Sequence, residues 1–176
     1  ANTTIEDVDI GLYSDGGPLN VTDGTVVENA STGGISSYGP LTVDTTTLNN
    51  TSSGIGAADE VTVRDTTMTN LSTPGDTSVG LRLAEGATGT VASVTIRGVA
   101  EDTESETTGY GVDVSNSSVT LSDSHISNVA DDGVNVSADG SATIENTAIR
   151  NVDVGLYSDG GPLNVTDGTV VENAST

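Results

Sequence analysis

Residues 11–32, GLYSDGGPLNVTDGTVVENAST, recur letter for letter as residues 155–176. The match extends upstream, where NTTIEDVDI at 2–10 corresponds to NTAIRNVDV at 146–154. A repeat this faithful, at an offset of 144 residues, means that position 145 re-enters the structure begun at position 1. Only a solenoid allows such head-to-tail continuation, because a closed globule has no place for a further copy.

The sequence therefore predicts a single segment over residues 1–176, with one tandem repeat at 1–144 and the start of the next copy at 145–176. The period divides again, because a shorter motif opens at seven glycines that stand 20 to 31 residues apart. These are Gly11, Gly34, Gly54, Gly80, Gly111, Gly133 and Gly155. Each unit reads Gly-h-x-h, a variable turn, h-x-h, a corner rich in Thr, Asp and Ser, and then h-x-Asn-h, where h is apolar. This alternation predicts three short strands per unit.

Superimposing the units aligns the apolar residues into three columns, which predict three walls around a narrow aliphatic core. A helix is implausible because the segments are β-branched and rich in Ser, Thr and Gly. The first column is Leu12, Ile35, Ile55, Leu81, Val112, Val134 and Leu156. The second is made of pairs, among them Leu19 and Val21, Leu41 and Val43, Val61 and Val63, Val119 and Leu121, Ala142 and Ile144, and Leu163 and Val165. The third is Ile5, Val26, Leu48, Met68, Ile96, Ile126, Ile149 and Val170.

A row of asparagines follows the third column. Asn and Gly are the residues that accept a left-handed backbone at a tight bend, and stacked Asn side chains can hydrogen-bond from coil to coil. We therefore predict a structural Asn ladder at one bend, with Gly98 as its gap. Its main members are Asn50, Asn70, Asn128 and Asn151, with Asp7, Asn29 and Asn173 at the ends.

This pattern resembles the right-handed parallel β-helix of the pectin-lyase-like family. The resemblance covers the whole chain and implies an all-β solenoid of about seven coils with 20–31 residues each. It implies little about activity, because lyases, glycosidases, phage tailspikes, adhesins and surface layers share the fold.

The composition is strongly acidic, with 26 Asp and Glu against four basic residues, all Arg, and a formal net charge of −22. Nucleic acids and anionic membrane surfaces are excluded as partners because both require a basic surface. We interpret the acidity and the loss of Lys as adaptation to concentrated salt, in which counterions screen self-repulsion. The composition resembles that of an extracellular or surface protein of a halophilic archaeon. The chain has no Cys and therefore no disulfides.

The nearest match to a catalytic motif is Asp131-Asp132-Gly133, close to His125. It is similar to the paired aspartates of polygalacturonase-like hydrolases. That family also brings a Gly-His-Gly and an Arg-x-Lys, and this sequence contains neither. We expect the two aspartates to form a solvated bend and His125 to lie at a corner, so no catalytic residues and no enzyme activity are predicted.

Calcium is a candidate ligand, and no other cofactor is expected, because hard cations take oxygen ligands and this surface is rich in them. Two insertions, at 72–78 and 100–110, are expected to leave the stack at the same bend. The weak metal candidates are Asp15, Asp23, Asp159 and Asp167, and the loop residues Glu101, Asp102, Glu104 and Glu106.

Ten Asn-x-Ser/Thr sequons occur in the chain, and those on the ladder are expected to be inaccessible. The candidate glycan carriers are Asn20, Asn116, Asn135 and Asn164.

The leading hypothesis is a structural or adhesive rod or filament, extracellular or on the cell surface. Its expected partners are neighbouring copies of itself, end to end or side by side, together with cations and glycans. The alternative is a polysaccharide-acting lyase or hydrolase, or a viral receptor-binding spike, whose active region lies outside this segment.

Overall fold

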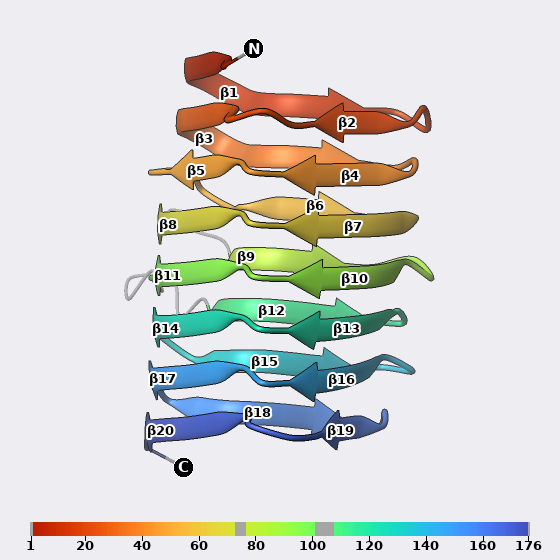
Figure 1. The fold of residues 1–176 in the computed structure, drawn as a ribbon, viewed down its shortest axis with the longest axis vertical. Coiled ribbons are helices and arrows are strands. Elements are labelled where there is room, and N and C mark those ends of the chain that lie inside the picture. Colours follow the sequence, from red (N-terminus) through yellow and green to blue (C-terminus); the bar gives the residue numbers. More distant parts are fainter. Residues whose placement is uncertain (1, 73–76, 101–107, 176) are drawn as a thin grey trace.

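The computed structural model describes residues 2–72, 77–100 and 108–175. The chain winds into a stack of coils in which each strand pairs in parallel with the strands of the coils above and below (Figure 1). The described residues form twenty strands and no helix. The predicted all-β solenoid of about seven coils with three short strands each is confirmed.

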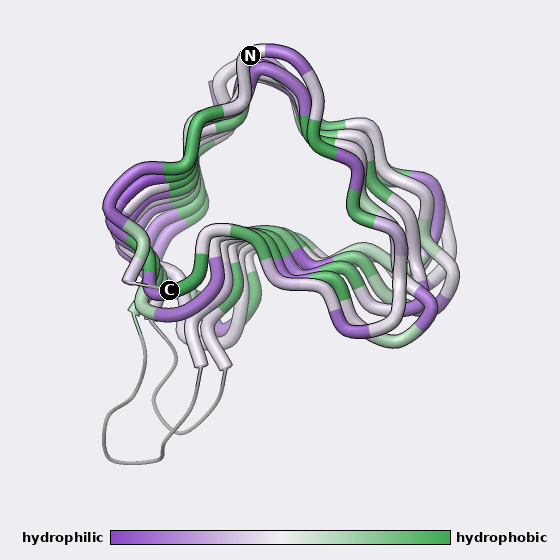
Figure 2. Tube along the Cα trace, turned by 90° about the horizontal axis from the view of Figure 1, so that it is seen from below, coloured by the Kyte–Doolittle hydropathy of each residue, from purple (hydrophilic) through white to green (hydrophobic). Residues whose placement is uncertain are grey.

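Viewed along the stack, each coil is a triangle whose three sides we call walls 1, 2 and 3, in the order in which the chain passes them after the start glycine (Figure 2). Wall 1 contains β6 (Ile55–Ala57), β9 (Ser78–Leu83), β12 (Gly109–Ser115), β15 (Asp132–Ser137) and β18 (Val154–Asp159). Wall 2 contains β2 (Leu19–Val21), β4 (Leu41–Asp44), β7 (Glu60–Arg64), β10 (Thr88–Ala92), β13 (Ser118–Ser122), β16 (Ser141–Glu145) and β19 (Leu163–Val165). Wall 3 contains β5 (Thr47–Asn49), β8 (Thr67–Leu71), β11 (Thr95–Val99), β14 (His125–Val129), β17 (Ala148–Val152) and β20 (Val170–Ala174).

Two long strands connect walls 3 and 1 at the N-terminal end of the stack. β1 (Thr4–Ser14) and β3 (Val26–Ser37) each run along wall 3, turn the corner and continue along wall 1. Walls 1 and 3 therefore belong to one sheet, whereas wall 2 is a separate seven-stranded sheet.

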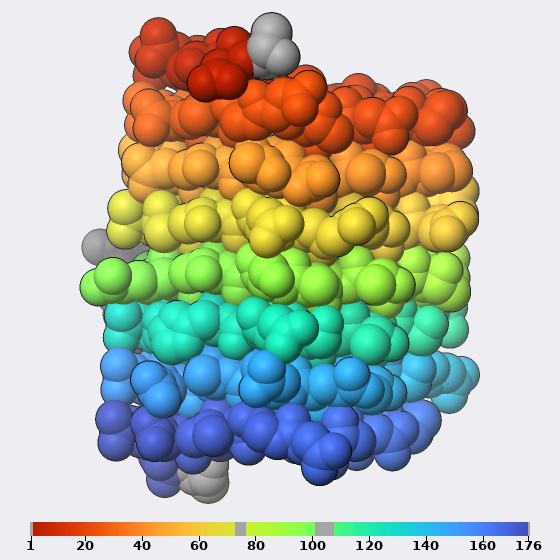
Figure 3. Space-filling model, in the orientation of Figure 1, coloured from red at the N-terminus to blue at the C-terminus, as the bar shows by residue number. Residues whose placement is uncertain are grey.

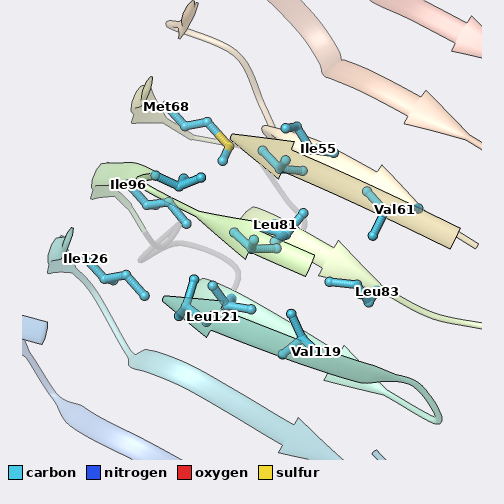
Figure 4. Packing of buried hydrophobic residues seen from close by; sticks show 14 of the residues in the cluster. Ile55, Val61, Met68, Leu81, Leu83, Ile96, Val119, Leu121 and Ile126 are labelled. Carbon is cyan, nitrogen blue, oxygen red and sulfur yellow. The ribbon is translucent and has the colours of Figure 1, made fainter. Parts of the chain in front are cut away.

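The core is the column of aliphatic side chains that the three walls enclose. Leu48, Met68, Ile96, Ile126 and Ile149 are in register from coil to coil along wall 3, and each is fully buried. Figure 4 shows Met68, Ile96 and Ile126 in successive coils. The columns of walls 1 and 2 are likewise in register, as predicted. Each buried Val, Leu or Ile side chain contributes roughly 1.5–3 kcal/mol.

One member of the predicted third column was wrong in each copy of the repeat. Val27, not Val26, is in register with Leu48, and Val171, not Val170, is in register with Ile149. In the first copy the extra residue lies before the strand, because both Asp23 and Gly24 adopt a left-handed backbone at the corner between walls 2 and 3. Asn29 and Asn173 therefore follow the column at the ordinary spacing of two residues.

The Asn ladder lies at the corner between walls 3 and 1, as predicted. Its members have φ between 53° and 55°, and Gly98 has a φ of 72° in their row. The amides donate along the stack in five steps: Asn29 to Asp7 at 2.9 Å, Asn50 to Asn29 at 2.7 Å, Asn70 to Asn49 at 2.9 Å, Asn151 to Asn128 at 3.1 Å and Asn173 to Asn151 at 3.0 Å. Asn70 thus uses Asn49 rather than the ladder member Asn50 as its acceptor.

A second ladder, which was not predicted from the sequence, lies at the corner between walls 2 and 3. Buried hydroxyl groups there donate to the carbonyl oxygen two residues earlier, which satisfies backbone acceptors at the bend. The pairs are Thr46 to Asp44, Thr66 to Arg64, Ser124 to Ser122 and Thr147 to Glu145, at 2.7 to 3.1 Å. The signal was available in the sequence, as a Ser or Thr two residues before the third column.

The start glycines are required by close packing between coils. A Cβ atom on Gly111 would lie 2.5 Å from the carbonyl oxygen of Gly133 and 2.6 Å from Cγ2 of Ile126. The same overlap recurs at the equivalent glycines of the other coils. A side chain at this position would therefore push wall 3 and the next coil away.

Residues 2–72, 77–100 and 108–175 contain no helix of the length and apolar character that crossing a membrane requires.

Candidate functional site

The outer face of wall 1 carries polar side chains that contact one another from coil to coil. Figure 2 shows that the backbone of this wall bends inward between the two corners that flank it. In the second, third and fourth coils the recess forms a hollow of about 390 Å³. Small residues line its floor, including Gly33, Ser53 and Gly56, and the side chains of Tyr38 and Arg82 also border it.

A chain of polar contacts continues from the hollow toward the C-terminal end. Arg82, Asp113 and Asn135 occupy the same position in three successive coils, two residues after the start glycine. The Nε of Arg82 donates to Oδ2 of Asp113 at 3.1 Å, and the Nδ2 of Asn135 donates to its Oδ1 at 2.9 Å. Asp113 and Asn135 are each 7% exposed. Both carboxylate oxygens of Asp113 are therefore engaged, and one basic residue compensates its charge.

Asp132 lies beside this chain, and its predicted place in a solvated bend is wrong. It begins β15 and is only 6% exposed. Its carboxyl group forms no hydrogen bond within the described part of the chain. Burial raises the pKa of Asp132 to about 6, and the negative charges of Asp131, Asp153 and Asp113 contribute in the same direction.

A carboxyl group with this pKa is a chemically distinctive feature of the wall. It is partly protonated near neutral pH, so it can either donate or accept a proton. Perturbed carboxyl groups of this kind cluster at functional sites, although structural burial also produces them. The outer face of wall 1 is therefore the candidate site, and among the described carboxyl groups Asp132 is the one whose pKa is raised.

His125 lies on wall 3, half-buried, in register with Thr95 and Ala148. It is the first residue of β14, just after the corner between walls 2 and 3, and it lies on a different wall from the one that carries Asp132. The two residues that are close in sequence do not form one constellation.

The metal candidates are not brought together. Asp15 lies in the turn before β2 and Asp23 lies at the corner after it, so that a whole strand of wall 2 separates them. Asp159 and Asp167 are separated by β19 in the same way. In the ranges 2–72, 77–100 and 108–175, no three Asp, Glu or His side chains are placed to hold a metal ion. Glu101, Asp102, Glu104 and Glu106 lie outside the described residues.

The described flanks of the two insertions lie together at the Asn-ladder corner. Thr77 and Thr108 approach within 3.4 Å through their hydroxyl oxygens, and the amide of Ala100 donates to the carbonyl oxygen of Leu71 at 2.9 Å. The described flanks of both insertions therefore meet at the same bend in successive coils, where the unit pattern predicted the insertions.

Two tyrosines mark the N-terminal end of wall 1. Tyr13 and Tyr38 meet edge to face, with ring centroids 6.2 Å apart, and both are about half exposed. Tyr157 is the repeat of Tyr13 and is exposed at the other end of the wall. The wall therefore carries aromatic rings at both ends of one period.

Comparison with known proteins gives one family. The model of the right-handed β-helix region matches residues 53–176, which is more than half of the chain. No curated protein and no solved structure matches the chain.

Proposed function

Because this chain belongs to the right-handed β-helix family, we propose that it is a segment of an extracellular structural or adhesive rod, built from 144-residue repeats and adapted to high salt. In this proposal the coils continue from one repeat into the next without interruption. The rod's role is to provide length and a regular surface, and it binds neighbouring copies, cations and glycans.

The main support for the proposal is that the same sequence is buried in one copy of the repeat and exposed in the other. Val21 and Val27 are 3% and 0% exposed, because the second coil covers the first. Their repeats, Val165 and Val171, are 47% and 42% exposed at the C-terminal end of the stack. The two segments are identical in sequence. A following repeat would therefore cover residues 155–175 in the same way that the second coil covers residues 11–32.

The C-terminal end of the stack exposes groups that are buried in the other coils, which is unfavourable unless another coil covers them. Figure 3 shows the coils as flat layers, with the layers of both ends uncovered. The strands β19 and β20 are the last of their walls and present unpaired backbone groups and apolar side chains. Such edges promote association with further strands. A following repeat would bury them and add about 29 Å of rod, since six coils stack at about 4.8 Å each.

The charge supports the location and the salt adaptation. A net charge of −22 on 176 residues destabilises a compact rod through self-repulsion in dilute buffer. The Debye length falls from about 10 Å at 0.1 M salt to about 3 Å at 1 M, so concentrated salt removes most of this repulsion. The acidic surface also keeps such rods apart until cations bridge them.

A chain extended by one period tests the rod. Residues 33–176 are appended after Thr176, and the lengths of the original and extended chains are compared by small-angle scattering and electron microscopy in high salt. The rod predicts about 29 Å more length at constant width, and slow hydrogen exchange at Val165 and Val171. Two separate particles, or a wider particle, would overturn the proposal. A parallel sample with chelator tests whether divalent cations contribute to side-by-side association.

A second candidate function is polysaccharide cleavage, favoured by the buried Asp132 on the recessed wall. Its test is incubation of the wild-type chain and of Asp132→Asn with acidic and neutral polysaccharides, with reducing ends and unsaturated products measured. Activity that Asp132→Asn abolishes would support an enzyme. Equal products from both chains would exclude Asp132 as the catalytic acid.

A further inference from the structure

The structure divides the ten sequons by what each asparagine amide does. An N-linked glycan is attached through Nδ2, so a carrier needs this nitrogen at the surface with space around it. The alternation of strand residues alone does not show which nitrogens are at the surface, because the coils stack closely and some outward side chains are covered.

The ladder asparagines use this nitrogen within the stack. Asn29, Asn50, Asn70 and Asn173 each donate from Nδ2 to the preceding coil at 2.7 to 3.0 Å. Asn49 is the acceptor for Asn70 and for Thr69. The nitrogen of each donor therefore faces the preceding coil rather than solvent, and an attached sugar would have to fit against that coil.

Two further sequons, Asn135 and Asn2, are set aside for different reasons. Asn135 points outward on wall 1 but is 7% exposed, and its Nδ2 donates to Asp113. Asn2 is exposed at the end of the stack, but its repeat Asn146 donates from Nδ2 to Asp123 of the preceding coil at 2.6 Å, so a preceding repeat would engage Asn2 in the same way. Asn135 is therefore removed from the four carriers that the sequence favoured.

Three sequons remain, and all are exposed. Asn20 and Asn164 are the middle residues of β2 and β19, in register with Thr42 and Thr143 on the outer face of wall 2. Asn116 lies in the turn between walls 1 and 2, with a φ of 48°. In the described residues, none of these three side-chain amides forms a hydrogen bond, so Nδ2 is available at each.

We propose that Asn20, Asn116 and Asn164 carry N-linked glycans and that the ladder asparagines and Asn135 do not. Each period then presents two glycans, one in the middle of wall 2 and one at its edge with wall 1. Asn20 and Asn164 are the same site in consecutive repeats, so this row of glycans recurs about every 29 Å along one side of the rod. The recessed face of wall 1 remains free for its own contacts.

The inference rests on the export of the proposed rod, because sequon glycosylation belongs to exported proteins. Mass spectrometry of the protein from its native host tests it. The basic residues limit trypsin to cleavage after Arg64, Arg82, Arg97 and Arg150, so Asn20 and Asn164 fall in different peptides. Peptide 151–176 holds Asn164 with Asn173, and peptide 98–150 holds Asn116 with Asn135, so each contains a proposed carrier and an internal control.

The expected result is hexose-containing mass on Asn164 and Asn116, with Asn173 and Asn135 unmodified when the peptides are fragmented by electron transfer. A second protease resolves the 1–64 peptide, in which modification is expected at Asn20 alone. The variant Asn164→Gln should remove the added mass from peptide 151–176 and leave the other peptides unchanged. Glycans on Asn173 or Asn135, or bare Asn20, Asn116 and Asn164, overturn the inference.

The experiments distinguish an error in the glycan sites from an error in the proposal that the chain is part of an exported rod. A surface-located protein without glycans overturns only the glycan sites, whereas an unmodified protein found inside the cell overturns export as well. The triple variant Asn20→Gln, Asn116→Gln, Asn164→Gln should still show the full gain in length when extended by one period, because none of these side chains packs in the stack.

Discussion

Arg150 lies on the outer face of wall 3 with its Nε 2.9 Å from Oε2 of Glu172 in the next coil. One period earlier, the equivalent positions hold Glu6 and Glu28, which are in register on β1 and β3. The same geometry therefore places like charges together in the first copy of the repeat and opposite charges together in the second. This difference gives a matched pair of sites within one chain.

We expect Glu6→Arg to stabilise the first coil and Arg150→Glu to destabilise the last. An exposed pair contributes about 0.2–1 kcal/mol, and opposed like charges cost a similar amount. Hydrogen exchange of the β3 amides should slow in Glu6→Arg, and exchange of the β20 amides should quicken in Arg150→Glu. Both effects should shrink in about 1 M salt because screening weakens exposed pairs. An equal effect at all salt concentrations would show that charge is not the cause.

Gly111 is required by close packing between coils, whereas Gly56 lies where a side chain would meet no other atom. In Gly111→Ala the new Cβ would lie 2.5 Å from a backbone oxygen and 2.6 Å from Ile126, so the coils must move apart. We expect a loss of about 3 kcal/mol or more in the free energy of unfolding, at the upper end of overpacking costs. A Cβ on Gly56 would have no atom within 4 Å, so Gly56→Ala should change stability by less than about 0.5 kcal/mol. Denaturant unfolding of both variants checks the contrast, and equal losses would contradict it.

The sequence predicts the walls well because every coil applies the same alternation. Leu48 and Met68 take equivalent places in units of similar length, and stacking of like on like follows. The position of the third column in the repeated segment was wrong because Val26 and Val27 are equally apolar. Only the backbone at Asp23 and Gly24 decides which of them faces inward.

The candidate site was harder to predict because it depends on the shape of a wall. Arg82, Asp113 and Asn135 share one position after the start glycine, so their proximity could have been read from the aligned units. The burial of Asp132 could not be read in the same way, because Asp132 stands just before the start glycine, where the unit pattern predicts a solvated bend and says nothing of the shape of wall 1.

The gap at Gly98 offers a stabilising change to the Asn ladder. Gly98 already has the left-handed backbone that Asn accepts, with a φ of 72°, and a Cβ there would meet Asn70 atoms only at 3.5 to 3.8 Å. Gly98→Asn should therefore raise the free energy of unfolding by about 0.5–1 kcal/mol, through a restricted unfolded chain and a new side-chain contact. Denaturant unfolding measures the gain, and a loss of stability would show that the row has no room for a further amide.

The converse change is Asn128→Ala. It removes the acceptor for Asn151 and places Ala at a φ of 53°, and we expect a loss of about 2 kcal/mol. Asn128→Gly is the control, since it removes the same hydrogen bond without the backbone strain. If Asn128→Gly costs as much as Asn128→Ala in thermal unfolding, the left-handed conformation is not what selects Asn.

Asp132 predicts a pH dependence opposite to that of a paired carboxylate. Its pKa is raised to about 6 in the folded chain, above the ordinary value of 3.8, so the folded state binds the proton more tightly than the unfolded state. This contribution to stability is fully present below about pH 4 and is lost as the pH rises through 6. With about 1.4 kcal/mol per pKa unit, the loss amounts to at most about 3 kcal/mol, and solvent access reduces it.

Asp132→Asn should therefore be more stable than the wild type at pH 7 and similar to it at pH 4. The difference between the two unfolding curves, measured by denaturant titration across this range at constant high salt, isolates Asp132 from the other acidic groups. A difference that does not change with pH would show that the carboxyl group does not titrate in this range.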